Sequence, residues 1–370
     1  MISKNKITSL IFFFLFVISF PLYSTIEIEN HQNFTYILLV LCLFLLLFNL
    51  QIIIRSLSLN RSVNLLLFIF FLLSFLTFFI KNDTNTFILL SPFFTFVAIA
   101  IVSQVRLNIN IFIFGFLFFY IYYYKIYFST LPSIFNRKEV GFDEELSFEA
   151  ASSNAIPIVL NNLLYIFLIL NNYYKLNKNK ILLLFSILNI VLIFIQNSRA
   201  GLVVSIILFL IILLEFYPKI IRKYPNITYL FIAYLAVLTL QLAIEQFDSG
   251  SYNINEITNE GRTVAQLAFF LNMTEFSFFW GYPEGFKFYV FDYTYNVFLD
   301  LWNKIGIIGF LLFVSLFLRR FIKYKKYHFP LIYFAPFLIY SSVETIFFPK
   351  YWDFVIVLLL IIPKNYRLNQ

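Results

Sequence analysis

Residues 181–216 read ILLLFSILNIVLIFIQNSRAGLVVSIILFLIILLEF, and this stretch decides the fold class. Two apolar runs, at 181–195 and 202–214, flank the small or polar residues Asn197-Ser198-Arg199-Ala200-Gly201. Apolar runs of roughly 17–25 residues can cross a lipid bilayer as helices, so the stretch predicts two membrane spans joined by a short connection. Arg199 lies in this connection, where desolvation of its charge is costly unless the side chain has a partner or a function.

The composition places the whole chain among polytopic membrane proteins. Of the 370 residues, 61% are apolar and 12% are charged, far outside the soluble globular range. The net charge of +8 does not indicate nucleic acid, because the basic residues fall in short connections on one side of the predicted topology. With one cysteine, Cys42, and two histidines, His31 and His328, on opposite predicted faces, we expect no disulfide, metal site or cofactor.

The apolar runs predict about twelve transmembrane helices in a single membrane domain, residues 1–370, of an all-α integral membrane protein. The predicted spans are residues 7–23, 34–54, 62–80, 86–104, 109–128, 155–170, 181–196, 200–216, 227–244, 296–318, 329–347 and 351–363. Lys4 and Lys6 precede the first run, and no small-x-small cleavage site follows near Tyr23. We therefore expect a retained first helix rather than a signal peptide.

The charges of the connections predict which side of the membrane each connection faces. When the connections are assigned alternately to two faces, one face collects 18 basic residues and a single acid, Glu215. These basic residues are Lys4, Lys6, Arg55, Arg61, Arg106, Lys175, Lys178, Lys180, Lys219, Arg222, Lys223, Arg319, Arg320, Lys323, Lys325, Lys326, Lys364 and Arg367. The other face has nearly all the acids and 7 basic residues, namely Lys81, Arg137, Lys138, Arg199, Arg262, Lys287 and Lys350. Because cytoplasmic connections are rich in lysine and arginine, both termini are predicted to be cytoplasmic.

Two long connections, residues 129–154 and 245–295, are predicted on the outer face. Long loops on a rigid scaffold are where binding and catalytic residues concentrate. In the second loop, Thr258-Asn259-Glu260 is an N-cap signal before the amphipathic stretch 262–271. We expect a short helix there, lying along the outer membrane surface, with Arg262 in its first turn.

Arg199 and Arg262 are the candidate catalytic cations. A guanidinium group binds phosphate oxygens in a bidentate manner and stays charged at every relevant pH. Two such groups on the outer face suggest an anionic, lipid-linked substrate. Each also has a plainer interpretation, because Arg199 can extend to ordinary head groups and Arg262 can pair with Glu256 or Glu260 as a solvated surface charge.

The segment that follows Arg262 contains further candidates. Residues 280–285, WGYPEG, form a turn cluster with Gly281 and Gly285, and Tyr295-Asn296 leads directly into the tenth span. Glycine permits tight turns at such positions.

Within the tenth span, Gly306 and Gly309 permit close helix approach, and we expect packing there rather than substrate contact. Asp300 lies a few residues inside this span, with Lys304 one turn later as its predicted partner. A carboxylate inside a membrane is a candidate for function, and a structural ion pair explains it equally well.

These motifs resemble the O-antigen ligase/polymerase superfamily over residues 185–315, a core that includes the outer loop 245–295. That family has, in order, Ser-Arg-x-Gly, Arg, a glycine-rich turn, His-Asn and Gly-Ile-x-Gly. The corresponding residues here are Ser198-Arg199-Ala200-Gly201, Gly261-Arg262, Gly281, Gly285, Tyr295-Asn296-x-x-Leu299 and Gly306-x-x-Gly309. Six of the nine glycines fall in register, and twelve spans with a large outer loop late in the chain are also similar.

The resemblance implies a GT-C-like, metal-independent, inverting glycosyltransferase that acts on undecaprenyl-pyrophosphate-linked glycans at the outer face of the bacterial inner membrane. Arg199 and Arg262 would hold the donor pyrophosphate, whose negative charge grows as the glycosidic bond breaks and is stabilised by fixed cations. The residues that would contact substrate are Ser198, Gly281, Gly285, Tyr295 and Asn296. The implied partners are a lipid-linked oligosaccharide and membrane lipids, with no nucleic acid. Binding of a chain-length regulator is left open.

Tyr295 stands where the ligase branch of the family has histidine before asparagine. Histidine titrates near neutral pH and suits a general base, whereas tyrosine, with a pKa near 10, does not. This departure favours the more divergent polymerase members. Asp292 and Asp300 are the nearest carboxylates in the sequence, so Asp300 is a catalytic candidate while the base itself stays unassigned.

Three functions remain open at this point, and a polysaccharide polymerase of the O-antigen or capsule type is preferred. A polymerase transfers the growing glycan onto a new lipid-linked repeat unit, whereas an O-antigen ligase moves the finished glycan to another acceptor. A transporter or flippase would suit twelve spans, but charges near the midplane would mark its pathway. Here the charges inside the spans are few, chiefly Lys125, Asp300 and Lys304, and no internal repeat is evident.

Overall fold

The computed structural model describes residues 4–13, 155–174, 176–195, 199–216, 257–283, 286–288, 294, 296–325 and 334–343, with separate residues between 40 and 121 and residue 359. Apart from an isolated bridge at Phe288, these residues are helices and connecting turns, which confirms the all-α class. α1 (Lys4–Phe13) covers part of the first predicted span. Predicted spans 34–54, 62–80, 86–104, 109–128, 227–244 and 351–363 and loop 129–154 lie outside the described residues or are described only at separate positions.

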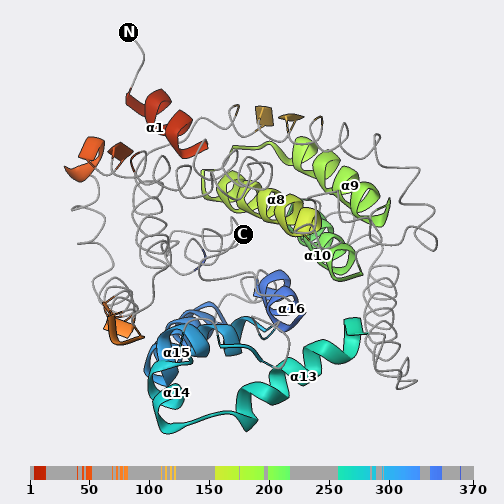
Figure 1. Ribbon diagram of the computed structural model, residues 1–370. Helices are drawn as coiled ribbons and strands as arrows, with labels where there is room; N and C mark the ends of the chain where they lie inside the picture. The colour runs from red at the N-terminus through yellow and green to blue at the C-terminus, as the bar shows by residue number, and fades with distance from the viewer. Residues whose placement is uncertain are drawn as a thin grey trace, which may run out of the picture.

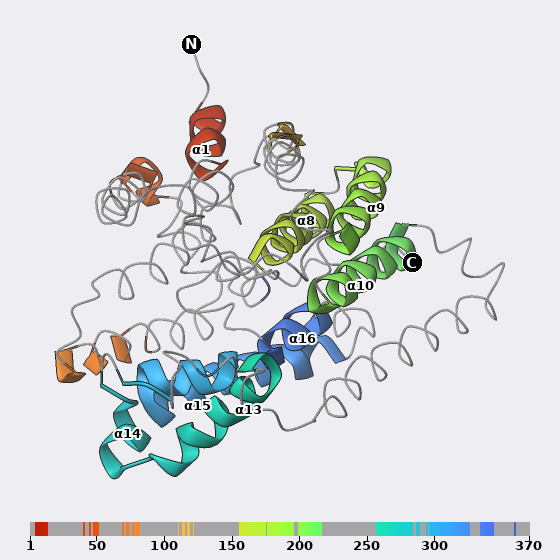
Figure 2. The same ribbon diagram turned by 45° about the vertical axis from the view of Figure 1, so that its right-hand side comes forward.

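Three helices form one packed group, in which α8 (Ala155–Tyr173), α9 (Asn179–Ile195) and α10 (Arg199–Phe216) each pack against the other two (Figures 1 and 2). Every residue of α8 from 157 to 171 is buried. A helix that is buried over this length must be covered on all sides, and α9 and α10 supply part of this cover. The three helices closely match the predicted spans 155–170, 181–196 and 200–216.

A network of asparagine side chains forms the turn between α8 and α9. The Asn171 amide Nδ2 donates to Asn179 Oδ1 at 3.0 Å, and its Oδ1 accepts from the Lys178 amide at 2.9 Å. Asn177 has φ 54°, a left-handed conformation that asparagine tolerates better than most residues. Both polar atoms of the Asn171 side chain are therefore hydrogen-bonded where the chain passes from α8 to α9.

A buried polar hub centred on Asn161 ties α8 to α10 and to α16 (Ala335–Val343). Asn161 Nδ2 donates to the Gly201 carbonyl oxygen at 2.9 Å and to the Tyr340 hydroxyl at 3.0 Å. Asn161 Oδ1 accepts from the Ser205 hydroxyl at 2.7 Å. Because Gly201 lies in the first turn of α10, the hub fixes the start of that helix against its neighbours.

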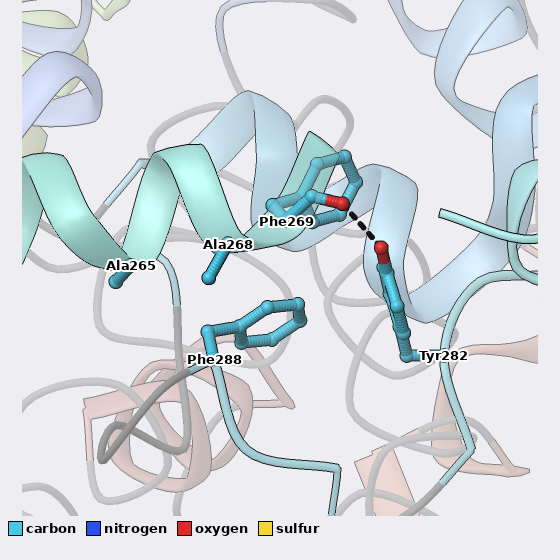
Figure 3. Close-up of a cluster of buried hydrophobic side chains, with 5 residues drawn as sticks. All are labelled: Ala265, Ala268, Phe269, Tyr282 and Phe288. Carbon is cyan, nitrogen blue, oxygen red and sulfur yellow. Dashed lines mark hydrogen bonds between the residues drawn. The ribbon is translucent and has the colours of Figure 1, made fainter. Parts of the chain in front are cut away.

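The predicted outer-loop region, described here over residues 257–283 and 286–288, contains α13 (Ile257–Leu271) and α14 (Glu275–Trp280). It has a second apolar cluster, formed by α13, the segment that follows α14 and the start of α15 (Val297–Lys325). Figure 3 shows the buried members, which are Ala265, Ala268, Phe269, Tyr282 and Phe288. Leu299 and Trp302 of α15 pack against this cluster. The outer loop is thus built on the first turns of α15.

The opposite face of α13 is apolar and exposed. Val264, Leu267 and Leu271 lie on this face at 37%, 55% and 83% exposure, spaced three and four residues apart. A helix with one apolar face against the protein and another open to its surroundings fits the expected position along a membrane surface.

The predicted start of α13 was wrong. The helix begins at Ile257, five residues before Arg262, so the N-cap signal at Thr258-Asn259-Glu260 lies inside the helix and Arg262 occupies the second turn. Packing of Ala265, Ala268 and Phe269 stabilises the helix as a whole, which outweighs the cost of about 1 kcal/mol for an internal glycine such as Gly261.

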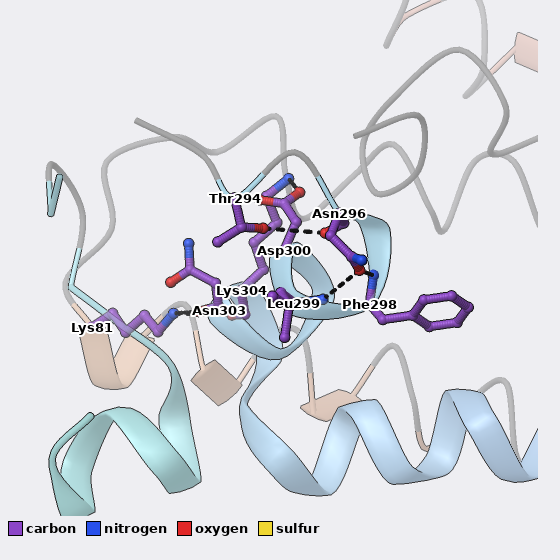
Figure 4. A network of polar contacts seen from close by, with 8 residues as sticks. All are labelled: Lys81, Thr294, Asn296, Phe298, Leu299, Asp300, Asn303 and Lys304. Atoms are coloured by element: carbon purple, nitrogen blue, oxygen red, sulfur yellow. Dashed lines mark hydrogen bonds and ion pairs between the residues drawn. The ribbon is translucent and has the colours of Figure 1, made fainter. Parts of the chain in front are cut away.

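The tenth predicted span is a helix with a sharp break. Within the described residues, Val297–Arg319 is the one helix that is long and apolar enough to cross a membrane by length and composition. It is interrupted at Gly306, whose backbone has φ 68° and ψ 178°. α15 therefore consists of a first half, residues 297–305, and a second half that runs in a different direction (Figure 4).

Candidate functional site

Two glycines bring the backbones of α14 and α15 into direct contact. Gly281 ends α14 with φ 83°, and a Cβ there would overlap the Asn303 carbonyl. A Cβ at Gly306 would overlap the Phe279 carbonyl oxygen and approach Trp280 Cα to 2.9 Å. We call this the glycine junction (Gly281, Gly306, Phe279 and Asn303). The packing role expected for Gly306 is confirmed, and Gly281 has the same structural role.

Side chains of α15 also secure this junction. The Trp302 indole N–H donates to the Phe278 carbonyl oxygen at 2.9 Å, and Asn303 Oδ1 accepts from the Tyr282 amide at 3.1 Å. Both bonds lead from the first half of α15 to the backbone around the end of α14. The first half is therefore held as part of the outer-loop region.

Asn296 is the N-cap of α15. Its Oδ1 accepts from the amides of Phe298 at 2.9 Å and Leu299 at 3.3 Å, and its carbonyl oxygen accepts from the Asp300 amide at 2.9 Å (Figure 4). An asparagine side chain satisfies the unpaired amides of a first helical turn in this way. The predicted substrate contact of Asn296 stays a prediction beside this structural role.

The predicted ion pair between Asp300 and Lys304 is confirmed. Lys304 Nζ lies 2.6 Å from Asp300 Oδ2, and the exposed fractions of the two side chains are 19% for lysine and 5% for aspartate. Among the described residues, Lys304 is the one side chain that forms a hydrogen bond or ion pair with this carboxylate. A nearly buried carboxylate next to a loop is the kind of group that a proton-transfer step requires.

Lys81 approaches this region from the N-terminal half of the chain. Its Nζ donates to the carbonyl oxygen of Asn303 and to that of Lys304, the latter at 3.2 Å (Figure 4). Both carbonyls lie at the end of the first half of α15, just before the break at Gly306. The sequence did not predict this contact, because 222 residues separate Lys81 from Asn303 and no motif joins them.

Tyr282 connects the turn after α14 to α13. Its hydroxyl donates to the Phe269 carbonyl oxygen, and 4% of the residue is exposed. Burial raises the pKa of the Tyr282 phenol, and a hydrogen bond with Ser277 partly opposes this shift. The neutral phenol is thus the form that holds α13 and α14 together.

The two candidate arginines occupy different helix positions. Arg199 is the first residue of α10, and Arg262 lies in the second turn of α13. Neither arginine side chain is among the described groups, so their meeting around one pyrophosphate stays a prediction.

The other predicted substrate contacts lie outside the described residues. These are Ser198, Gly285 and Tyr295. No protein-family model, no curated protein and no solved structure matches the chain. The functional assignment therefore rests on the residues and contacts of this chain.

Proposed function

We propose that the protein is a polysaccharide polymerase of the O-antigen or capsule type. It would be a GT-C-like enzyme of about twelve spans in the bacterial inner membrane, with both termini cytoplasmic. It would transfer a glycan from undecaprenyl pyrophosphate onto a lipid-linked repeat unit at the outer face, without a metal ion. The proposal takes its chemistry from the sequence motifs and its support from the geometry around α10 and α15.

The observation that carries the proposal is the position of Arg199 as the first residue of α10. A helix N-terminus carries unpaired amides and a partial positive charge, and both favour phosphate binding. The first turn of α10 holds no acidic residue that would oppose an anion. A guanidinium group at this end of the helix adds a full charge to the partial one, which suits a pyrophosphate.

The reaction needs a cationic site for the leaving group and a site for the acceptor proton. The acceptor hydroxyl oxygen attacks the anomeric carbon as the bond from that carbon to the pyrophosphate oxygen breaks. The pyrophosphate leaves with both bonding electrons, and Arg199 and Arg262 stabilise its charge. The hydroxyl proton passes to a carboxylate, for which Asp300 is the candidate because it is nearly buried and lies next to the outer loop.

A transporter or flippase is the second candidate, because the break in α15 is of the kind that forms substrate sites in transporters. In such sites the freed backbone carbonyls coordinate the cargo. Here the carbonyls of Asn303 and Lys304 accept hydrogen bonds from Lys81, and the backbone at Gly306 packs against Phe279. The break is therefore filled by protein groups, which favours the enzyme.

The test is polymerisation by the full-length protein in detergent with one lipid-linked repeat unit as both donor and acceptor. Wild-type protein should give a ladder of products, and Arg199→Ala and Arg262→Ala should each abolish it at unchanged membrane insertion. Arg319→Ala, a change on the predicted cytoplasmic side, is the matched control and should leave the ladder intact. Ladders of normal length from both outer-face variants would refute the pyrophosphate site. Product that forms only with a different acceptor would identify a ligase.

A further inference from the structure

The first half of α15 ends with carbonyl groups that need donors. The last four carbonyls of an α-helix have no amide partner within the helix. The break at Gly306 puts such an end in the middle of α15, at residues 302–305. Lys81 supplies donors to two of these carbonyls, those of Asn303 and Lys304. A cation is favourable at this end of a helix, where the backbone carries partial negative charge.

Lys304 is the basic residue that lies nearest to this helix end in the sequence, yet its ammonium points back along the helix. Its Nζ lies 2.6 Å from Asp300 Oδ2, one turn towards the N-terminus. A lysine in the last turn of a helix commonly donates to the last carbonyls. Because Lys81 donates to these carbonyls instead, the Lys304 ammonium pairs with Asp300.

We propose that Lys81 is a positioning residue for the polymerisation site, which makes this inference dependent on the proposed function. Lys81 holds the end of the first half of α15 and thereby keeps Lys304 paired with Asp300. The candidate carboxylate then has a fixed place relative to Asn296, at the start of the same half-helix, and to the outer loop.

The space for Lys81 is provided by Gly281. A Cβ at Gly281 would lie 2.7 Å from Lys81 Nζ, as well as overlapping the Asn303 carbonyl. The Lys81 ammonium group therefore lies next to both the end of α14 and the end of the half-helix. This contact connects the N-terminal half of the chain to the predicted outer-loop region, 222 residues later in the sequence.

Lys81→Met is the informative change, because it removes the charge and the donors and keeps most of the length of the side chain. Lys81→Arg keeps both the charge and the donors and should largely restore the wild-type behaviour. Lys287→Met is the matched control, since Lys287 is an exposed lysine of the same predicted outer-loop region. All three are made in the full-length protein.

Two measurements separate positioning from general stability. The first is hydrogen–deuterium exchange of the amides of residues 297–305 in detergent, which needs no activity. The second is the rate of polymerisation as a function of lipid-linked substrate concentration. Lys81→Met should raise the exchange of this segment and lower kcat by about tenfold to hundredfold with little change in KM, because displacement of a reacting group impairs the chemical step more than binding.

Three results would overturn the inference. The first is unchanged exchange in Lys81→Met, which would show that Lys81 does not hold the half-helix. The second is faster exchange with unchanged kcat, which would reduce Lys81 to a structural cap. The third is an equal effect of Lys287→Met, which would make the effect one of net charge. Absence of polymer from wild-type protein would overturn the proposed function instead, and the exchange measurement would still decide whether Lys81 holds the half-helix.

Discussion

Replacement of Gly306 by alanine should weaken the glycine junction by about 2–6 kcal/mol. Gly306 has φ 68° and ψ 178°, a conformation that costs a residue with a Cβ about 1–3 kcal/mol. The new Cβ would also overlap the Phe279 carbonyl oxygen and come within 2.9 Å of Trp280 Cα. Both are backbone atoms and cannot rotate away, so relief requires a shift of the chain at a further cost of about 1–3 kcal/mol.

Gly309 provides the matched control, three residues later in the same helix. It is not among the described glycines with positive φ. A Cβ at this position would meet the Ile305 side chain, with Cδ1 at 2.6 Å, Cγ1 at 2.8 Å and Cβ at 2.9 Å. A rotamer change can move Cδ1 and Cγ1, whereas the Ile305 Cβ moves only with its backbone. Alanine is a better helix former than glycine by about 1 kcal/mol, which offsets part of the cost of this contact. Gly309→Ala should therefore be less destabilising than Gly306→Ala, because the backbone at Gly309 does not have the positive φ that disfavours a Cβ.

The assay is hydrogen–deuterium exchange of the amides of residues 297–305, in full-length protein in detergent. Where exchange follows local opening, a loss of about 3 kcal/mol raises the rate more than about a hundredfold. Gly306→Ala should show this increase in residues 297–305 and in α14, while Gly309→Ala should show a clearly smaller increase. Equal exchange in the two variants would refute the reasoning, since it would mean that neither the backbone conformation nor the contact with Phe279 constrains Gly306.

Three further outcomes are expected. Because burial raises the pKa of Tyr282 in the folded protein, the phenol of the unfolded chain ionises at a lower pH. The stability that the neutral phenol confers should therefore fall as the pH rises above about 10. The difference in thermal unfolding temperature between wild type and Tyr282→Phe should narrow between about pH 8 and about pH 11, and a constant difference would contradict this. Asn161→Leu should lower the unfolding free energy by about 2 kcal/mol, since it removes three interhelical hydrogen bonds of about 0.6 kcal/mol each. Thermal unfolding in detergent measures this change. An unchanged unfolding midpoint would show that the hydrogen bonds of Asn161 do not stabilise the helix packing. In a Cys42→Ser background, a fluorophore on Leu271→Cys should be quenched by spin-labelled lipid acyl chains more than one on Glu275→Cys; equal quenching would argue against α13 lying at the membrane surface.

The helices that the sequence predicted well are those whose formation depends on composition alone. α8, α9 and α10 follow apolar runs with few polar residues, and length and hydrophobicity are sufficient to define such segments. The hub at Asn161 could not be predicted in the same way. An asparagine in an apolar run indicates a buried polar contact, but its partners Ser205 and Tyr340 come from helices 44 and 179 residues away.

The ion pair in the candidate site was predictable because it is local, whereas the break in α15 was not. Asp300 and Lys304 are four residues apart, and helical geometry alone brings them together. The break at Gly306 depends on the Phe279 carbonyl and on Lys81, which reach it from distant parts of the chain. A glycine in an apolar run is compatible with a straight helix, a close helix contact or a break, and only the tertiary contacts decide among them.

The break at Gly306 changes the depth at which Asp300 should lie in the membrane. In a straight tenth span, Asp300 would be inside the hydrocarbon region, where a carboxylate is costly. In the structure, its half-helix packs on α14 of the outer loop and ends on Lys81, which the charge distribution assigns to the outer face. In the proposed topology, the apolar part of the second half, residues 307–318, would be about 18 Å long at about 1.5 Å per residue and would lead from this outer end towards the cytoplasmic Arg319 and Arg320. A carboxylate at the outer interface can meet both a pyrophosphate held by a membrane lipid and a sugar hydroxyl in water, whereas one at the midplane can meet neither.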